Sequence, residues 1–145
     1  MNRLLFLCTG NYYRSRFAEI FFNWHAEQRG LCWRAESRGL ALVKENVGPL
    51  SCYTVRRLAA HGISTAAHQR LPLAVCEMDL QTAHHIVAVK EAEHRPLIQA
   101  KFPTWIDRVE FWTVHDVDCA AAEEAIPLLE GEVMQLLDRL AARVA

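Results

Sequence analysis

A cysteine and an arginine close together near the start of the chain have the most specific chemistry in this sequence. Cys8 follows an apolar run at positions 4–7, Arg14 comes six positions later, and Ser15 stands beside the arginine. A thiolate is a strong nucleophile, and a guanidinium is a planar fork that binds two phosphate oxygens at once. Ser15 can donate a hydrogen bond to the sulfur and so steady a thiolate. The pattern therefore predicts a nucleophile facing a bound anion.

The residues between the cysteine and the arginine suit a loop that closes around such an anion. A loop that leads from a strand into a helix N-terminus directs several backbone N–H groups into one concavity. Gly10 lets the backbone approach a ligand closely, and Asn11 tolerates a left-handed conformation and can brace the loop. A nucleotide-binding P-loop is excluded because no Gly-Lys-Ser/Thr follows. The predicted phosphate-binding residues are Thr9, Gly10, Asn11, Tyr12, Tyr13, Arg14 and Ser15.

The same cysteine–arginine spacing occurs a second time, in different surroundings. Cys32 and Arg38 are also six positions apart, but no glycine lies between them, and Gly39 follows where a serine or threonine would be needed. We interpret this second copy as chance.

The elements that must position the first loop follow from the hydrophobic pattern. Leu4 to Leu7 reads as a buried strand, and 14–29 as a helix that ends at Gly30. Further strands are predicted at 33–37, 86–89 and 109–114, a further helix at 50–61, and a weak helical pattern at 91–100. Alternating strands and helices favour a mostly parallel sheet covered on both faces. Sites in such sheets lie at the carboxyl ends of the strands, where Cys8 and the region of Asp116 could meet.

The C-terminal segment from Ala121 has apolar residues at helical spacing, but Pro127 lies within it. Proline removes a hydrogen bond inside a helix and is tolerated in the first turn. We therefore expect a break at Pro127, or a main helix that begins there.

The bulk composition is that of an ordinary globular protein. The 145 residues are 52% hydrophobic and 23% charged, with a formal net charge of −1 at pH 7. This size fits one domain over 1–145, and the charge argues against general nucleic-acid binding. No apolar run approaches the ~20 residues that cross a bilayer. Five scattered cysteines without a CxxC pair indicate thiols in a reducing compartment, hence a cytoplasmic protein. The oligomeric state is left open.

The stretch CTGNYYRS at 8–15 resembles the signature loop of the low-molecular-weight protein tyrosine phosphatases, Cys-x-Gly-Asn-x-Cys-Arg-Ser. The matching residues are Cys8, Gly10, Asn11, Arg14 and Ser15. Looser similarity covers nearly all of the chain, through Ser37-Arg38-Gly39, GPLSCYTVRRLAAHGI (48–63), His68-Gln69-Arg70 and HHIVAVK (84–90).

The resemblance implies a single α/β domain with a four-stranded parallel sheet and helices on both faces. It also implies phosphate-monoester hydrolysis, usually of protein phosphotyrosine, without a metal or other cofactor. Cys8 would attack phosphorus to form a phosphocysteine, and Arg14 with the loop amides would stabilise the equatorial oxygens. The partner would be a phosphorylated protein or a small phosphomonoester.

The resemblance further implies a general acid just after the fourth strand, where the family has Asp-Pro. Asp116 is the best match, although Val117 stands where proline is expected. Asp118 is the alternative acid, or else the N-cap of the following helix.

Two residues of the loop region, Tyr13 and Arg16, depart from the family pattern. Tyr13 replaces the second cysteine, which can form a protective disulfide with the nucleophile. Arg16 stands where proline is common and is expected to add positive charge at the rim. Tyr12 lies where the family lines its substrate cleft, and its ring could stack on an aromatic leaving group.

The same loop residues are also compatible with other functions. Thioredoxin-coupled arsenate reductases share the fold but need two relay cysteines at and after the third strand. Lys90 stands at the first of these positions, and Cys76 lies upstream of the strand. A glutaredoxin-coupled reductase and a non-hydrolytic phosphate- or anion-binding module stay as alternatives. A phosphocysteine carrier would not require Arg14 or Asp116.

Overall fold

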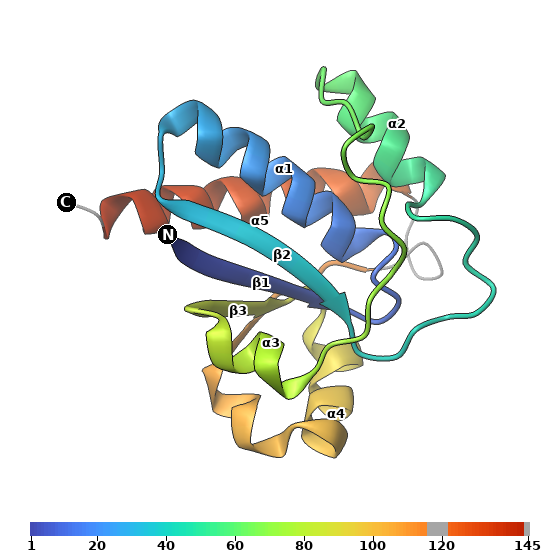
Figure 1. Ribbon diagram of the computed structural model, residues 1–145, viewed down its shortest axis with the longest axis vertical. Helices are drawn as coiled ribbons and strands as arrows, with labels where there is room; N and C mark the ends of the chain where they lie inside the picture. Colours follow the sequence, from blue (N-terminus) through green and yellow to red (C-terminus); the bar gives the residue numbers. More distant parts are fainter. Residues whose placement is uncertain (116–121, 144–145) are drawn as a thin grey trace.

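Four parallel strands form the sheet at the centre of the molecule, in the order β2-β1-β3-β4. They are β1 (Asn2–Cys8), β2 (Trp33–Gly39), β3 (His85–Ala88) and β4 (Val109–Phe111). The structure is a computed structural model, and it describes residues 1–115 and 122–143 of the chain (Figure 1). Each strand pairs in parallel with its neighbours, and the register places Cys8 opposite Gly39. The parallel, four-stranded sheet is confirmed.

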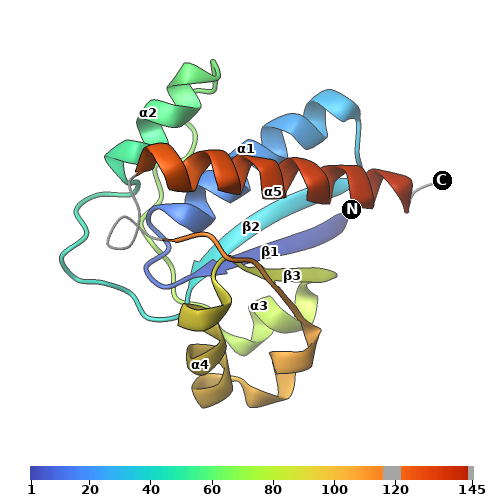
Figure 2. The same ribbon diagram turned by 180° about the vertical axis from the view of Figure 1, so that it is seen from behind.

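Helices cover both faces of this sheet (Figures 1 and 2). Helices α1 (Arg14–Arg29) and α5 (Ala122–Ala142) pack together on one face. Helices α3 (Glu77–Thr82) and α4 (Glu91–Lys101) lie on the other. Helix α2 (Cys52–Ala60) packs beside α1, and the 3₁₀ helix η1 (Pro103–Arg108) follows α4. The two covered faces explain why β1 and β3 contain short apolar runs, at 4–7 and 86–88.

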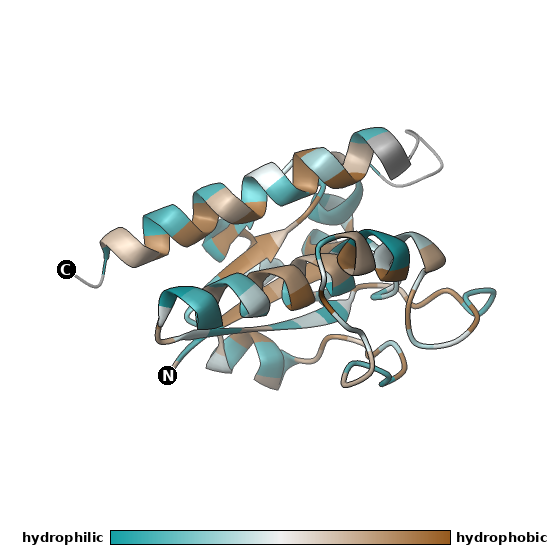
Figure 3. Cartoon of the chain, turned by 90° about the horizontal axis from the view of Figure 1, so that it is seen from above, coloured by the Kyte–Doolittle hydropathy of each residue, from teal (hydrophilic) through white to brown (hydrophobic). Residues whose placement is uncertain are grey.

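Successive side chains of β1 point to opposite faces of the sheet, and the hydrophobic core therefore has two parts. Leu4 and Phe6 point into the cluster formed with α1 and α5, whereas Leu5 and Leu7 point into the cluster on the α3 and α4 side. This follows from the two-residue period of a strand. In Figure 3, α5 carries both polar and apolar positions along its length. Strand β1 is therefore central, and its end at Cys8 is held from both sides.

Most predicted boundaries agree with the structure to within a few residues. Helix α1 has the predicted range, and Gly30 ends it in a left-handed conformation with φ of 66°. Helix α2 begins two residues later than expected because Ser51 caps it, accepting a hydrogen bond from the Tyr53 backbone N–H. Strand β4 is shorter than predicted, but ladder-like hydrogen bonds continue past it to Val114, whose N–H donates to Val89 at 2.8 Å.

The expected break at Pro127 is wrong. Helix α5 begins at Ala122 and runs to Ala142 with Pro127 inside it. The proline is the sixth helical residue, two positions past the first four N–H groups that have no helical partner, so its missing N–H costs one hydrogen bond. Burial of Leu129, Val133 and Leu136 in the core favours continuing the helix. In the described ranges, no helix is long and apolar enough to span a membrane.

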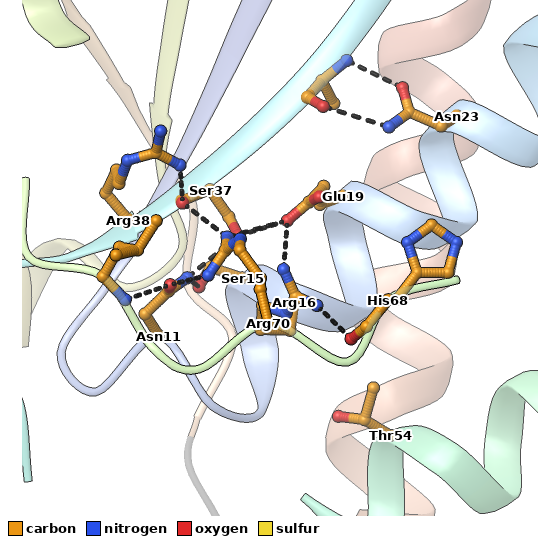
Figure 4. A network of polar contacts seen from close by, with 12 residues as sticks. Asn11, Ser15, Arg16, Glu19, Asn23, Ser37, Arg38, Thr54, His68 and Arg70 are labelled. Carbon is orange, nitrogen blue, oxygen red and sulfur yellow. Dashed lines mark hydrogen bonds and ion pairs between the residues drawn. The ribbon is translucent and has the colours of Figure 1, made fainter. Parts of the chain in front are cut away.

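Asn11 braces the loop between β1 and α1 (Figure 4). Its backbone is left-handed, with φ of 51°. Its side-chain Nδ2 donates to the hydroxyls of Ser15 and Ser37, both at 2.9 Å. Its Oδ1 accepts from Arg70 Nη1 and from the Leu73 backbone N–H, both at 3.0 Å. One fully buried amide therefore joins the loop, the end of β2 and the segment 64–75.

A group of charged residues surrounds Glu19, next to the contacts of Asn11 with Ser37 and Arg70. Glu19 accepts from Ser37 Oγ at 2.5 Å and pairs with Arg16 at 3.2 Å and Arg70 at 3.4 Å. Arg16 also donates to the carbonyl of His68 at 2.6 Å and is only 1% exposed. The expectation that Arg16 charges the rim is therefore wrong, because segment 64–75 covers it. Burial lowers the pKa of Arg16, and Glu19 opposes this effect.

Gly39 lets β2 approach the loop closely. A Cβ atom there would lie 2.8 Å from the Thr9 carbonyl oxygen and 3.1 Å from the Asn11 Cβ. Real Cβ atoms essentially never come within 3.0 Å of a backbone oxygen. The loop and β2 fit together only because this position is glycine.

Glu110 fastens α5 to the far part of the sheet. Arg139 of α5 binds it with two hydrogen bonds of 3.0 and 2.7 Å. His85 Nε2 lies 3.0 Å away, and Trp112 Nε1 donates at 2.6 Å. Burial raises the pKa of Glu110, but the contacts with His85, Arg139 and Trp112 outweigh it and hold the pKa well below its usual range.

We expect Asn11→Ala to lower the free energy of unfolding by about 3 kcal/mol, because it strands several buried donors and acceptors. Asn11→Gly loses the same hydrogen bonds but tolerates the left-handed backbone, so it should cost about 1 kcal/mol less. Urea unfolding of both variants measures the difference, with Gln28→Ala on the exposed side of α1 as control. A glycine variant no more stable than the alanine variant would contradict this account of the loop.

We expect Glu110→Gln to lower the free energy of unfolding by roughly 1 kcal/mol at pH 7, because it removes the charge that pairs with Arg139. The loss stays this small because the pair is partly exposed. The pKa of Glu110 is lower in the folded protein than in the unfolded chain, where it is about 4.3. The carboxylate therefore stabilises the fold above this unfolded pKa, and the stabilisation is lost as the pH falls below it. The difference between wild type and variant should therefore shrink between about pH 5 and pH 3. Denaturant unfolding across this range measures it, with the exposed Glu27→Gln as control. A pH-independent difference would show that the charge of Glu110 is not what stabilises α5.

Candidate active site

The predicted nucleophile and arginine lie together at the carboxyl end of the sheet. Cys8 is the last residue of β1, and Arg14 is the first residue of α1. Both are only 2% exposed. The loop between them, 9–13, turns at the edge where ligands bind in open parallel sheets.

Two hydrogen-bonding groups point at the sulfur of Cys8. Ser15 Oγ lies 2.8 Å from Sγ, and the Asn11 backbone N–H donates to Sγ at 3.2 Å. Ser15 Oγ is itself placed by the Asn11 side chain, which donates to it. The hydroxyl can therefore direct its own proton at the sulfur. This surrounding suits a sulfur that carries negative charge.

Arg14 is held at both ends of its guanidinium. Nη1 donates to the carbonyl oxygen of Val114 at 3.1 Å, and Nη2 pairs with Glu93 Oε2 at 2.8 Å. Val114 follows β4, and Glu93 lies in the first turn of α4. Two neighbouring strand ends thus fix the orientation of the arginine.

Glu93 and His94 are parts of the site that the sequence analysis missed. Glu93 Oε2 accepts from the Thr9 hydroxyl and lies 3.1 Å from His94 Nε2. His94 is fully buried, and its Nδ1 accepts from the Lys90 backbone N–H at 3.1 Å. Its proton therefore sits on Nε2, which faces Glu93. Hydrogen bonds from His94, Arg14 and Thr9 outweigh burial and hold the pKa of Glu93 well below its usual range.

A signal for Glu93 was present in the sequence. An acidic residue in the first turn of the helix after a parallel strand lies at the carboxyl edge, beside the site. The chain offers Glu91 and Glu93 at this place, and only the structure shows which of them turns inward. Glu91 instead pairs with Arg95 on the exposed side of α4.

The two tyrosines of the loop point to different surroundings. The Tyr12 hydroxyl donates to the carbonyl of Val47 at 2.7 Å, so its ring lies along the segment that follows β2. Tyr13 is buried, and its ring centroid lies 6.0 Å from that of Tyr53. The Tyr13 carbonyl accepts from Thr54 Oγ1 at 3.0 Å. Helix α2 therefore supports the loop from outside the sheet.

Apolar side chains from the segment after β2 border the loop. A Cβ atom at Gly10 would lie 3.6 Å from Val43 and 3.0 Å from Asn46 Nδ2, so this segment passes directly over the loop backbone. Leu42 is 44% exposed and Val47 82% exposed. The border beside the loop is thus partly apolar and open to solvent.

The predicted acids, Asp116 and Asp118, lie outside the described residues. The carbonyl of Val114, two positions before Asp116, contacts Arg14 as described above. Among the described residues, no group of three or more His, Cys, Asp or Glu side chains could hold a metal ion.

The second cysteine–arginine pair does not form a comparable site. Cys32 is exposed and directly precedes β2, whereas Arg38 lies near the end of that strand. Six residues of extended chain separate their backbones by about 20 Å. The strand between them explains why the same spacing gives no loop here.

The sequence profile of the family described as "Low molecular weight phosphotyrosine protein phosphatase" matches residues 3–144. No curated protein sequence matches the chain.

Solved structures resemble it along nearly the whole length. YfkJ from Bacillus subtilis has a TM-score of 0.85 at 25% identity, with 99% of this chain and 96% of that chain covered. The low molecular weight protein tyrosine phosphatase from T. tengcongensis has a TM-score of 0.78 at 26% identity, with 99% of both chains covered. The YwlE arginine phosphatase from Geobacillus stearothermophilus has a TM-score of 0.73 at 22% identity, over 99% of this chain and 93% of that one.

The family profile covers almost every residue, and the fold agrees with it. The chain belongs to the low molecular weight phosphotyrosine protein phosphatases, which are cysteine-based phosphatases that need no metal ion.

Proposed function

We propose that the chain hydrolyses phosphotyrosine in proteins through a phosphocysteine intermediate formed on Cys8. One observation carries the proposal: the buried Cys8 sulfur has hydrogen-bonding groups at 2.8 and 3.2 Å and shares its loop with an oriented arginine. A bound phosphoryl group would meet nucleophile and guanidinium together. Such prior positioning is a large part of enzymatic rate enhancement.

The proposed reaction has two displacements at phosphorus. In the first, Cys8 Sγ forms the S–P bond while the P–O bond to tyrosine breaks, and Asp116 gives its proton to the leaving phenoxide. In the second, water attacks phosphorus, Asp116 takes the proton back, and the S–P bond breaks to release phosphate. Arg14 and the backbone amides of 9–15 stabilise the three equatorial oxygens in both transition states.

Ser15 has a defined part in the second displacement. The sulfur leaves as a thiolate, and the Ser15 hydroxyl at 2.8 Å can donate to it as negative charge returns. The Asn11 side chain donates to the same oxygen at 2.9 Å, which leaves the serine proton free for the sulfur.

The substrate class is supported by the residues beside the loop. The Tyr12 ring is tethered through its hydroxyl to Val47, and Leu42 and Val47 expose apolar surface. A phenyl ring of phosphotyrosine can pack on such a wall, and aromatic pairs gain stability from this. A phosphoserine side chain is too short to carry an apolar group to the same wall.

The alternatives differ in the group that reaches Cys8. Two of the similar solved structures are of YwlE arginine phosphatases, so phosphoarginine is a competing substrate. Arsenate reduction would need relay thiols, and Lys90 occupies the place of the first, at the start of α4. A non-hydrolytic anion-binding module would use the same loop without turnover.

A cytoplasmic location with phosphorylated proteins as partners completes the proposal. Cys32, Cys52 and Cys76 are exposed and free, as expected of thiols in a reducing compartment. The net charge of −1 gives no general attraction to nucleic acid or to anionic membranes.

We expect a phosphotyrosine peptide to be hydrolysed with kcat/KM about 10²-fold above the matched phosphoserine peptide, because only the aromatic group uses the wall beside the loop. Cys8→Ser should lower kcat by about 10⁴-fold or more, since it removes the nucleophile. Cys32→Ser, at the second cysteine–arginine pair, is the matched control and should leave kcat unchanged. Phosphate release from both peptides, a phosphoarginine peptide and p-nitrophenyl phosphate measures this. Faster hydrolysis of phosphoarginine, or turnover in Cys8→Ser, would contradict the proposal.

We expect Asp116→Asn to impair phosphotyrosine hydrolysis more than hydrolysis of p-nitrophenyl phosphate. Tyrosine, with a pKa of about 10, is a poorer leaving group than the more acidic p-nitrophenol and needs the proton more. The loss in kcat should be about 10²-fold on the peptide and smaller on the nitrophenyl ester. Asp118→Asn is the matched control and should cost little on either. The reverse ranking of the two variants would make Asp118 the acid.

A further inference from the structure

We propose that Glu93, held by His94 and Thr9, is the residue that positions Arg14 for its contact with the phosphoryl group. The inference deepens the proposed function and rests on it for the phosphoryl group, but not for the contacts among these four residues.

A single oxygen collects the contacts. Glu93 Oε2 lies 2.8 Å from Arg14 Nη2 and 3.1 Å from His94 Nε2, and it accepts from the Thr9 hydroxyl. The three donors come from three elements: the start of α1, the start of α4 and the loop after β1. An oxygen approached from three sides has little freedom to move, so the guanidinium bound to it is fixed as well.

His94 can serve only as a donor toward Glu93. Its ring is fully buried and its Nδ1 accepts from the Lys90 backbone N–H, so the proton on Nε2 faces the carboxylate. Thr9 Oγ1 also lies 3.1 Å from this nitrogen. The ring therefore orients Glu93 without needing a positive charge of its own.

The carboxylate acts directly on the arginine. Arg14 is 2% exposed, and the Glu93 side chain is 30% exposed. Glu93 and the Val114 carbonyl engage Nη2 and Nη1, so the guanidinium plane is set by protein groups. A guanidinium has five N–H donors in one plane, so fixing the plane fixes the direction of all of them. A phosphoryl group reached by them benefits only if the plane is correct, because misplacement by about 1 Å costs up to 10²-fold in rate.

The position in the fold suits a carboxylate. Glu93 is in the first turn of α4, where the helix dipole favours negative charge. Its charge also partly offsets that of Arg14 close to the bound anion. A neutral glutamine at 93 keeps the accepting oxygen and removes a repulsive charge, whereas alanine removes the acceptor. The two substitutions therefore separate positioning from charge.

The test measures binding of orthovanadate by calorimetry, because this needs no turnover; orthovanadate becomes a five-coordinate mimic of the transition state when a thiolate adds to it. We expect Glu93→Ala to weaken vanadate binding about tenfold, and Glu93→Gln to stay within about threefold of wild type. Glu91→Ala is the matched control: it removes a carboxylate from the same helix turn that pairs with the exposed Arg95, and should have no effect. Thr9→Val, which removes one donor to Glu93, should weaken binding about threefold and serves if Glu93→Ala does not fold.

A kinetic readout separates positioning from a general structural effect. In p-nitrophenyl phosphate hydrolysis, Glu93→Ala should lower kcat about tenfold or more while KM changes less than about threefold. In an Arg14→Lys background the same substitution should change kcat/KM less than about twofold, because Glu93 acts through the guanidinium.

Several results would overturn the inference. These are vanadate affinity in Glu93→Ala within twofold of wild type, an equal loss in Glu93→Gln, or an undiminished effect of Glu93→Ala when Arg14 is lysine. Wild-type protein that binds vanadate but hydrolyses no phosphate ester would contradict the proposed function alone, and the binding series would still decide the role of Glu93. Wild-type protein that binds no vanadate would overturn both.

Discussion

The left-handed backbone at Asn11 is the constraint on which the site depends. A chain leaving β1 at Cys8 must turn back within a few residues to begin α1 at Arg14, and the turn is made at this residue. The conformation is costly for most residues, and Asn11 compensates through its side-chain amide, which reaches both Ser15 and Arg70. The same bonds that hold the loop also orient the serine at the sulfur. Loop stability and chemistry are therefore supplied by one residue.

Two separate groups of ion pairs lie on either side of this loop, a rear layer formed by Arg16, Arg70 and Glu19 and a front layer formed by Arg14 and Glu93. Behind it, Arg16 and Arg70 share Glu19 and connect the segment 64–75 to the end of β2. In front, Arg14 is paired with Glu93. Each buried or half-buried arginine has a carboxylate, which limits the cost of removing the charges from water. The rear layer keeps the loop in shape, and the front layer leaves a cation oriented toward an incoming anion.

Local signals predicted much of this structure from the sequence. The apolar run at 4–7 placed β1, the 3.6-residue period with Gly30 as helix stop placed α1, and the spacing of Cys8 and Arg14 placed the loop. Contacts between distant segments could not be read in this way. Arg16 appeared to be a surface charge because the segment that covers it is about 50 residues away. Glu93 and Glu91 look alike in the sequence, and only the packing of α4 decides which one meets Arg14. Pro127 was misjudged because core packing along α5 outweighs the loss of one hydrogen bond.

The central claim is that Cys8 itself takes the phosphoryl group. Mass spectrometry of the protein, stopped in denaturant during turnover of p-nitrophenyl phosphate, tests this most directly. The account predicts one added phosphoryl group on the peptide that contains Cys8, appearing within the first turnover and disappearing once substrate is exhausted. A phosphoryl group on another residue, or steady turnover with none on the Cys8 peptide, would contradict it.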